Sequence, residues 1–349
     1  MGQYRSLKLK TLELGDGIPK ICVPITAADA ASAVAQAEAI AASCDADMAE
    51  WRVDRFDMGF SLTGSADIEK IRVAARRICD ALKGKPLIFT FRNYEEGGER
   101  FLPEQDYRRL VMTAIEDGAA DLVDVEFKKK NVLEEAVRLA QCKGKKHCGK
   151  AVSIIASYHD FDKTPDFAEL IKLFKEMQII GAGITKIAVM PSGESDVKKL
   201  TDAAHEMKEH IADRPYVAIS MGEQGRRTRL EAADLGSALS FAVITPGSTE
   251  SEKYVSMNVS GDDLSGRLPG KNAGHSAGAA SAPGQIPLEE LKKYRARRLP
   301  DDLADRHARR RRAPDAGTRI SPSRTTVGPP WSSGTQVVRT GERRHEPTE

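Results

Sequence analysis

A lysine in the middle of an apolar run is the first chemical feature of this chain. Lys186 lies within ITKIAVM (184–190), a stretch that has the composition of a buried strand. Desolvation lowers the pKa of a lysine, and a neutral lysine is a nucleophile. The alternative is a strand at an edge or barrel mouth, from which the ammonium group extends to water. Polar residues on the other strands decide between the two.

Four other apolar runs carry a polar pair near their C-terminal ends. Side chains alternate between the two faces of a strand, so residues two positions apart share a face. Burying such a mixed cluster is costly unless it binds something, so we favour a binding site over a salt-bridged layer that closes the end of a barrel. The pairs are Glu50 with Arg52, Thr90 with Arg92, Asp124 with Glu126, and Ser157 with His159.

These residue types together predict one kind of reaction. The arginines favour a carboxylate or another anion. Lys186 is suited to attack a ketone or aldehyde as a Schiff base, and His159 can move a proton near neutral pH. An iminium group draws electrons and makes the proton on the neighbouring carbon acidic. The set therefore predicts proton abstraction beside a carbonyl of an anionic keto substrate, and elimination, aldol cleavage and isomerisation all stay open.

The elements that must position these residues alternate regularly up to about residue 243. Short apolar strands are followed by amphipathic stretches of helical length, which predicts a parallel sheet with right-handed crossovers. Eight such units fit a closed (β/α)₈ TIM barrel. An open doubly wound sheet is the alternative, but no G-x-G-x-x-G follows the first strand. The predicted strands are 20–26, 47–53, 86–91, 121–127, 151–157, 184–190, 215–220 and 238–244, and a last helix is predicted at 287–294.

Two segments depart from this regularity. Residues 245–280 form a Gly/Ser-rich stretch that is too long for an ordinary loop between a strand and a helix. Residues 295–349 hold 13 Arg, no Lys and 7 Asp plus Glu. We predict a single catalytic domain over 1–294 with an insertion at 245–280, followed by a disordered tail over 295–349. The tail is either a basic arm for nucleic acid, centred on 307–312, or a frameshift or read-through product, which we favour.

Composition excludes several classes of protein. The chain has 349 residues, of which 40% are hydrophobic, yet it has no run of 18 apolar residues and no apolar signal core at its start. Its five cysteines are scattered, which is typical of a reducing cytoplasm. Cys142, His147 and Cys148 lie close together, but no second ligand pair stands at zinc-type spacing, so no metal site is predicted.

Six ordered motifs resemble those of type I 3-dehydroquinate dehydratase, a lyase of the shikimate pathway, over about residues 18–294. The resemblance implies a (β/α)₈ barrel, often a homodimer, that needs no metal or organic cofactor. It also implies the dehydration of 3-dehydroquinate to 3-dehydroshikimate. The motifs are EWRVDRFD (50–57), TFRNYEEGGER (90–100), SYHDF followed by TP (157–165), TKIAVMP (185–191), MGEQGRRTR (221–229) and SAPGQI (281–286).

The resemblance also implies roles for individual residues. Lys186 would form the Schiff base, His159 would remove and return the proton, and Glu96 would orient the histidine. Arg229 and Gln285 would hold the substrate carboxylate, and Ser281 would belong to the closing loop. The residues around the substrate hydroxyls would be Glu50, Arg52 and Arg92.

The sequence departs from the family at Thr228, where serine is usual, in the long stretch 245–280, and in the 55 residues after 294. Two alternatives stay open. One is another class I Schiff-base barrel enzyme, such as an aldolase. The other is an inactive barrel with a basic binding tail. We expect a cytoplasmic enzyme with no membrane partner, and we do not favour nucleic acid as a partner.

Overall fold

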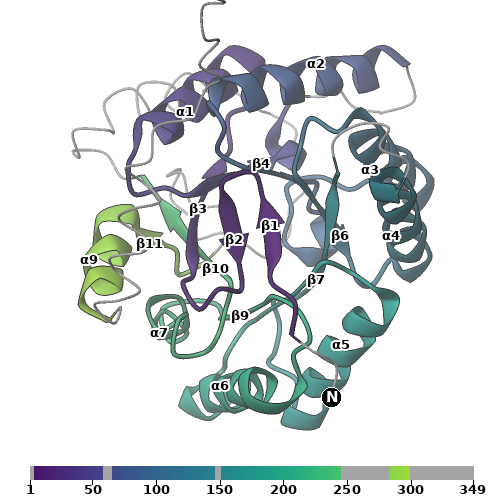
Figure 1. The fold of residues 1–349 in the computed structure, drawn as a ribbon. Helices are drawn as coiled ribbons and strands as arrows, with labels where there is room; N and C mark the ends of the chain where they lie inside the picture. The colour runs from purple at the N-terminus through teal and green to yellow at the C-terminus, as the bar shows by residue number, and fades with distance from the viewer. Residues whose placement is uncertain (1–3, 58–64, 146–150, 245–282, 299–349) are drawn as a thin grey trace, which may run out of the picture. The chain divides into compact units, whose positions relative to one another are not determined.

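The computed structural model describes residues 4–57, 65–145, 151–244 and 283–298. Within these residues the chain alternates strands and helices, and the strands form one curled parallel sheet (Figure 1). The (β/α)₈ barrel fold predicted from the sequence is confirmed. The predictions for the stretch 245–280, for the tail from 299 and for the pair His147 and Cys148 concern residues outside the described ranges.

Each of the eight predicted strands is present. In sheet order the strands of the barrel begin with β10 and end with β9. Their bounds are β3 (Lys20–Ile25), β4 (Met48–Arg52), β5 (Leu87–Thr90), β6 (Leu122–Glu126), β7 (Ser153–Asp160), β8 (Ile184–Val189), β9 (Tyr216–Ser220) and β10 (Leu239–Val243).

The barrel closes where β9 meets β10. At the N-terminal ends of these strands, the backbone N–H of Ala238 donates to the carbonyl of Tyr216 over 2.8 Å. At their C-terminal ends the short strand β11 (Ile286–Pro287) pairs with β10. The preceding Pro283 carbonyl accepts the N–H of Gly222, just after β9, over 3.3 Å. Residues 283–287 therefore bridge the two strands at the end where the predicted site residues lie.

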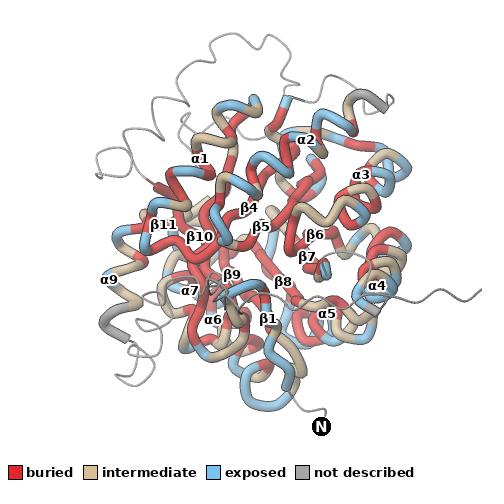
Figure 2. Tube along the Cα trace, turned by 45° about the horizontal axis from the view of Figure 1, so that its top comes forward, coloured by how far each residue is buried: buried red, intermediate tan, exposed pale blue. Residues whose placement is uncertain are grey.

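Helices surround the strands, and their buried faces pack toward the sheet (Figure 2). In α5, apolar residues recur at helical spacing, the Asp166 side chain accepts the N–H of Glu169 at the start, and Gly181 ends the helix with φ +93°. The helices are α1 (Ala30–Ala42), α2 (Ser65–Ala81), α3 (Glu104–Asp117), α4 (Lys130–Lys145), α5 (Phe167–Ile180), α6 (Glu194–Glu206), α7 (Arg227–Leu230) and α9 (Leu288–Arg298).

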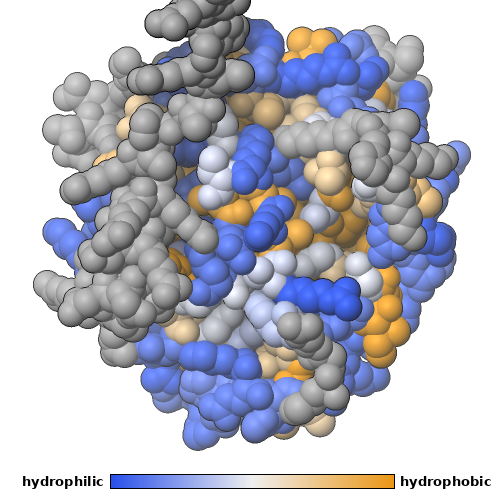
Figure 3. Space-filling view, in the orientation of Figure 1, coloured by the Kyte–Doolittle hydropathy of each residue, from blue (hydrophilic) through white to orange (hydrophobic). Residues whose placement is uncertain are grey.

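The sequence did not reveal a hairpin that closes the lower end of the barrel, which is the end where the parallel strands begin. Strands β1 (Leu7–Leu9) and β2 (Leu12–Leu14) pair antiparallel and lie at the centre of the view in Figure 1. Figure 3, in the same orientation, shows hydrophilic and hydrophobic residues intermingled on this face. Leu9 and Leu14 are buried against apolar residues of the barrel interior, so this end is packed and the polar residues gather at the other. Those interior residues include Cys22, Met48, Ile88, Leu122, Ile155, Ile184, Val217 and Leu239.

The last helix is longer than predicted. It continues to Arg298, so the domain boundary that we predicted after residue 294 falls within it. Arg295 makes an ion pair with Asp47, at 2.7 Å between Nη1 and Oδ2. The same Asp47 oxygen accepts the backbone N–H of Ile21 in β3. The first residue of the predicted tail is therefore attached to the barrel.

Candidate active site

A pocket with an empty volume of about 510 Å³, part of it open to solvent, lies at the C-terminal ends of the strands. Eight of the nine residues predicted to form the site line it, and the ninth, Ser281, lies outside the described residues. Apolar side chains complete the wall. The lining residues are Glu50, Arg52, Thr90, Arg92, Glu96, Gly97, His159, Phe161, Lys186, Ala188, Ile219, Met221, Arg229, Phe241 and Gln285.

Lys186 is 5% exposed and extends into this pocket from the middle of β8. Its Nζ lies 3.6 Å from Oδ2 of Asp124 and 3.9 Å from Oε1 of Glu50. It also lies 4.6 Å from the centre of the Phe241 ring, which is a cation–π arrangement. Both distances are longer than a hydrogen bond, so the two carboxylates lie near the amine without accepting a hydrogen bond from it.

His159 and Glu96 form a hydrogen-bonded pair. His159 Nδ1 lies 3.1 Å from Oε2 of Glu96, and the same oxygen accepts the backbone N–H of His159 over 3.2 Å. Glu96 reaches this position because the chain makes a 3₁₀ turn over Tyr94–Glu96 that ends at Gly97 with φ +82°. A side chain at Gly97 would collide with Phe161, since an added Cβ would lie 2.2 Å from the ring.

The electrostatics of this pair favour a neutral imidazole. Burial lowers the pKa of His159 well below its usual range, and the nearby cations Arg92 and Lys186 lower it further. Burial raises the pKa of Glu96 to about 8, against the opposing effect of Arg92. Once Glu96 is ionised, its Oε2 accepts both the backbone N–H of His159 and the ring, so we assign the hydrogen of the neutral imidazole to Nδ1. Nε2 then carries a lone pair and can act as a base.

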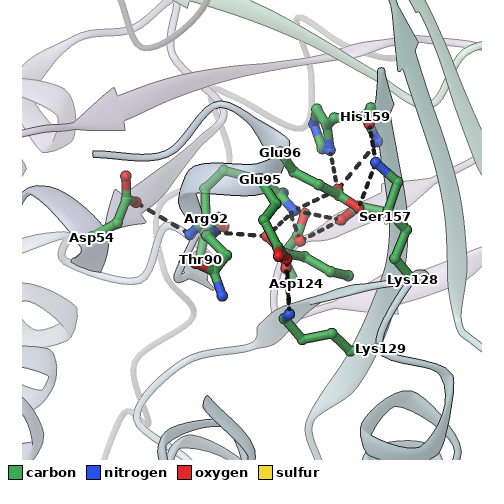
Figure 4. Close-up of polar contacts among 12 residues, drawn as sticks. Asp54, Thr90, Arg92, Glu95, Glu96, Asp124, Lys128, Lys129, Ser157 and His159 are labelled. Carbon is green, nitrogen blue, oxygen red and sulfur yellow. Dashed lines mark hydrogen bonds and ion pairs between the residues drawn. The ribbon is translucent and has the colours of Figure 1, made fainter. Parts of the chain in front are cut away.

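Arg92 makes hydrogen bonds and ion pairs with several polar residues of the site (Figure 4). Its Nη2 donates to Oδ1 of Asp124 over 2.7 Å, and its Nη1 donates to Oγ of Ser157 over 2.9 Å. Ser157 in turn donates to the same Asp124 oxygen over 2.6 Å. Burial opposes the ionisation of Asp124, but Arg92 and Lys186 lower its pKa below the usual value. A charged Asp124 therefore connects the arginine to the lysine.

Arg52 is held by a partner that the sequence did not suggest. Asp54 accepts two hydrogen bonds from its guanidinium group, from Nε over 2.8 Å and from Nη2 over 2.7 Å. The carboxylate also accepts the backbone N–H groups of Arg92 and Glu99. Burial opposes the charge on Asp54, yet Arg52 and these hydrogen bonds lower its pKa. Asp54 lies beyond the end of β4, where the alternation of faces no longer indicates direction.

Arg229 differs from the other arginines of the pocket. It is 2% exposed, and within the described part of the chain no carboxylate lies within ion-pair distance of it. Its Nη1 donates to the Ser220 carbonyl over 3.2 Å and its Nη2 to the Pro283 carbonyl over 2.9 Å. Burial lowers its pKa to about 10. A buried cation paired only with carbonyls favours an anionic ligand.

Residues beside Arg229 hold this corner of the pocket. Thr228, at the position where the family usually has serine, donates to the Gly225 carbonyl over 2.8 Å and accepts the N–H of Ser220 over 3.0 Å. Gln285 follows Gly284, which has φ +73° and lies so close to Gly222 that an added Cβ would be 2.2 Å from the Gly222 carbonyl oxygen. This backbone approach brings Gln285 to the pocket that Arg229 also lines.

The described residues contain no cluster of three or more His, Cys, Asp or Glu that could hold a metal ion. None of the helices in the described ranges is both long enough and apolar enough to cross a membrane.

Comparison with known proteins assigns the chain to a family. Residues 21–253 match the family described as type I 3-dehydroquinase. This chain belongs to that family. It is 40% identical over 237 residues to the 3-dehydroquinate dehydratase of Syntrophotalea carbinolica, covering 68% of this chain and 88% of the relative. It is 36% identical over 245 residues to that of Escherichia coli K12, covering 70% and 92%.

Solved structures agree with this assignment. The type I 3-dehydroquinate dehydratase of Clostridium difficile, in a structure with covalently modified comenic acid, aligns with a TM-score of 0.67 at 32% identity, covering 84% of this chain and 97% of that one. The 3-dehydroquinate dehydratase of Enterococcus faecalis aligns with a TM-score of 0.61 at 35% identity, covering 68% and 93%. The barrel and its family are therefore established together.

Proposed function

We propose that this chain dehydrates 3-dehydroquinate to 3-dehydroshikimate through a Schiff base on Lys186. Family membership supports the overall reaction. The mechanism rests on the pocket, where one observation carries the proposal: a buried lysine lies in the same cavity as a neutral histidine and a buried arginine that lacks a carboxylate partner among the described residues. On one substrate, the lysine can react with a ketone, the histidine can remove an acidic proton and the arginine can bind a carboxylate.

In the first step, the Lys186 amine attacks the ring ketone, and water leaves to form an iminium ion. Phe241 and Asp124, which both lie near Nζ, support this role, because they stabilise the cation that forms. Glu50, whose Oε1 accepts the hydroxyl of Thr90 over 3.0 Å, lies beside the same nitrogen.

In the second step, Nε2 of His159 takes the proton from the carbon next to the iminium group, and the electron pair moves to the iminium nitrogen to give an enamine. Glu96 stabilises the imidazolium that results, since it accepts the hydrogen of Nδ1. The enamine then expels the ring hydroxyl, which takes the proton from His159 and leaves as water. Hydrolysis of the conjugated iminium releases the product and restores Lys186.

Arg229 and Gln285 are proposed to bind the substrate carboxylate, while Arg52 and Arg92 bind its hydroxyl groups. The carbonyl partners of Arg229 support this division, because they orient the guanidinium group without neutralising it. Arg52 and Arg92 are already paired with Asp54 and Asp124, so they suit neutral hydroxyls better than a second anion.

The direct test is to mix the purified chain with 3-dehydroquinate and follow the ultraviolet absorbance of the conjugated enone product. We expect a rise that is lost in Lys186→Ala and strongly reduced in His159→Ala. Full activity in His159→Ala would disprove the proton-transfer role. No rise with the wild-type chain would mean that it does not carry out the reaction of its family.

Family membership favours this reaction over an aldolase. The third reading, a barrel whose basic tail binds nucleic acid, is tested by truncation after Arg298, which keeps the whole of α9. We expect dehydratase activity to survive this truncation. A full-length chain that has no dehydratase activity but binds nucleic acid, and that loses this binding on truncation, would favour the third reading.

We further propose that the enzyme is a homodimer, as the resemblance implies. We also propose that it is cytoplasmic, because its cysteines are scattered. Light scattering of the purified protein measures the assembly state. A monomer mass at working concentration would contradict the dimer.

A further inference from the structure

A lysine outside the pocket lining contacts the pair of Glu96 and His159. Lys128 follows β6, and its Nζ donates to the backbone carbonyl of His159 over 3.1 Å. The same nitrogen lies 3.8 Å from Oε1 of Glu96 and 5.2 Å from the centre of the Tyr158 ring. Figure 4 shows Lys128 on the side of His159 and Glu96 away from Arg92 and Asp54. Its side chain is 46% exposed, so it can be replaced without opening the core.

The two oxygens of Glu96 have different surroundings. Oε2 receives the ring and the backbone N–H of His159, with the Arg92 guanidinium at 3.5 Å. Oε1 is buried, and within the described residues it accepts no hydrogen bond. The Lys128 ammonium is the cation that faces it. Without this cation, a proton on Oε1 would relieve the desolvated charge.

Charged groups from every neighbouring strand face this pair. Arg92 follows β5, Glu126 and Asp124 come from β6, Lys186 from β8 and Arg52 from β4. The two acids raise the pKa of Glu96, and Arg92 and Lys128 lower it. The cations, Lys128 among them, lower the pKa of His159. Lys128 therefore opposes an additional proton on either member of the pair.

We propose that Lys128 is a positioning residue that keeps the Glu96–His159 pair in the form able to accept a proton. Its ammonium group holds the charge on Glu96 and fixes the His159 carbonyl, so that the imidazole keeps its hydrogen on Nδ1 and its lone pair on Nε2. This inference rests on the proposed role of His159 as the base.

The experiment compares the pH dependence of kcat/KM in the wild type, Lys128→Gln, Lys128→Arg and Lys130→Gln. Lys130→Gln is the matched control, because Lys130 lies two residues further on and pairs with Glu176 of α5 over 3.5 Å, away from the pair. In Lys128→Gln we expect the acid limb to move upward by about half a pH unit, the size typical of a partly exposed charge pair. On that limb, activity then falls about threefold.

The other variants define the cause. Lys128→Arg keeps the charge and is expected to retain most of the wild-type profile, and Lys130→Gln all of it. An unchanged acid limb in Lys128→Gln would overturn the proposal, and so would an equal shift in Lys128→Arg. Borohydride trapping of the Lys186 adduct is expected to persist in all four proteins, whereas its absence from the wild type would refute the proposed function instead.

High salt provides a second measurement that needs no variant. Because Lys128 is partly exposed, added salt screens its charge more than it screens the buried charges. We expect salt to move the acid limb of the wild type toward that of Lys128→Gln and to leave that of Lys128→Gln nearly in place. An equal salt effect on both proteins would contradict the proposal.

Discussion

Replacing Arg229 by methionine separates the contribution of this residue to folding from its contribution to binding. Burial lowers the pKa of Arg229 to about 10, so the group is charged at pH 7 in both the folded and the unfolded chain. The difference from the ordinary arginine pKa corresponds to a folding penalty of about 3 kcal/mol. Since the folded pKa is the lower one, this penalty is complete below about pH 10 and disappears only above the ordinary arginine pKa.

Two hydrogen bonds offset part of this penalty in the unliganded protein. Arg229 donates to the carbonyls of Ser220 and Pro283, and each bond contributes about 1 kcal/mol. The net change in the free energy of unfolding on Arg229→Met is therefore within about 2 kcal/mol and of either sign. Substrate binding is expected to suffer far more, since removing one partner of a buried charge pair costs about 2–5 kcal/mol.

The assay combines kinetics with thermal unfolding. Arg229→Met is expected to raise KM by about 30-fold or more and to abolish the stabilisation of the protein by added 3-dehydroshikimate. Arg227→Met is the control, because Arg227 lies on the same short helix and pairs with Glu194 at the surface over 2.7 Å. An unchanged KM in Arg229→Met, or a large loss of stability without a change in KM, would refute this reasoning.

Two further predictions concern the acids of the site. The kcat/KM of the wild type is expected to fall as the pH drops below about 8, because burial raises the pKa of Glu96 to about 8 and a neutral Glu96 no longer offsets the positive charge that His159 gains when it takes the proton. A pH–rate profile with an acid limb below about pH 6 would contradict this. Asp54→Asn is expected to lower the free energy of unfolding by about 3 kcal/mol, since it leaves the buried Arg52 without its anion. Urea denaturation measures this loss, and a change below about 1 kcal/mol would show that Arg52 finds another partner.

The alternation of strand faces predicted much of the pocket from sequence. Glu50, Arg52, Arg92, His159 and Lys186 each lie on the face that points into the barrel, and the structure brings all five to one cavity. This succeeded because the period of a strand is two residues and the polar residues follow apolar ones on the same face. The same rule places Phe241 beside the lysine, since it shares a face with Leu239, but an aromatic residue in a strand gave no reason to single it out.

Residues beyond the strand ends could not be placed in the same way. Glu96 reaches His159 through a 3₁₀ turn, and Arg229 reaches the pocket from a four-residue helix held by Thr228. Their positions depend on backbone conformations at Gly97 and on the contact of residue 283 with Arg229, which no periodicity encodes. Resemblance to the family supplied these residues.

The N-terminal hairpin was missed for a related reason. Its strands have three residues each, and the sequence LKLKTLEL shows alternation too short to distinguish from a loop. Only the burial of Leu9 and Leu14 against the lower end of the barrel reveals its role. Lys128 likewise lies in a run of three lysines that resembles a solvated surface, and its contact with Glu96 depends on the fold.

The Schiff base on Lys186 is the central claim, and reductive trapping tests it most directly. The wild-type chain is incubated with 3-dehydroquinate and sodium borohydride, digested and analysed by mass spectrometry, with Lys186→Ala treated in parallel. A stable adduct on the peptide that contains Lys186, absent from the variant, is the predicted result. Turnover of 3-dehydroquinate without any adduct on Lys186, or an adduct on another lysine that persists in Lys186→Ala, would contradict the account.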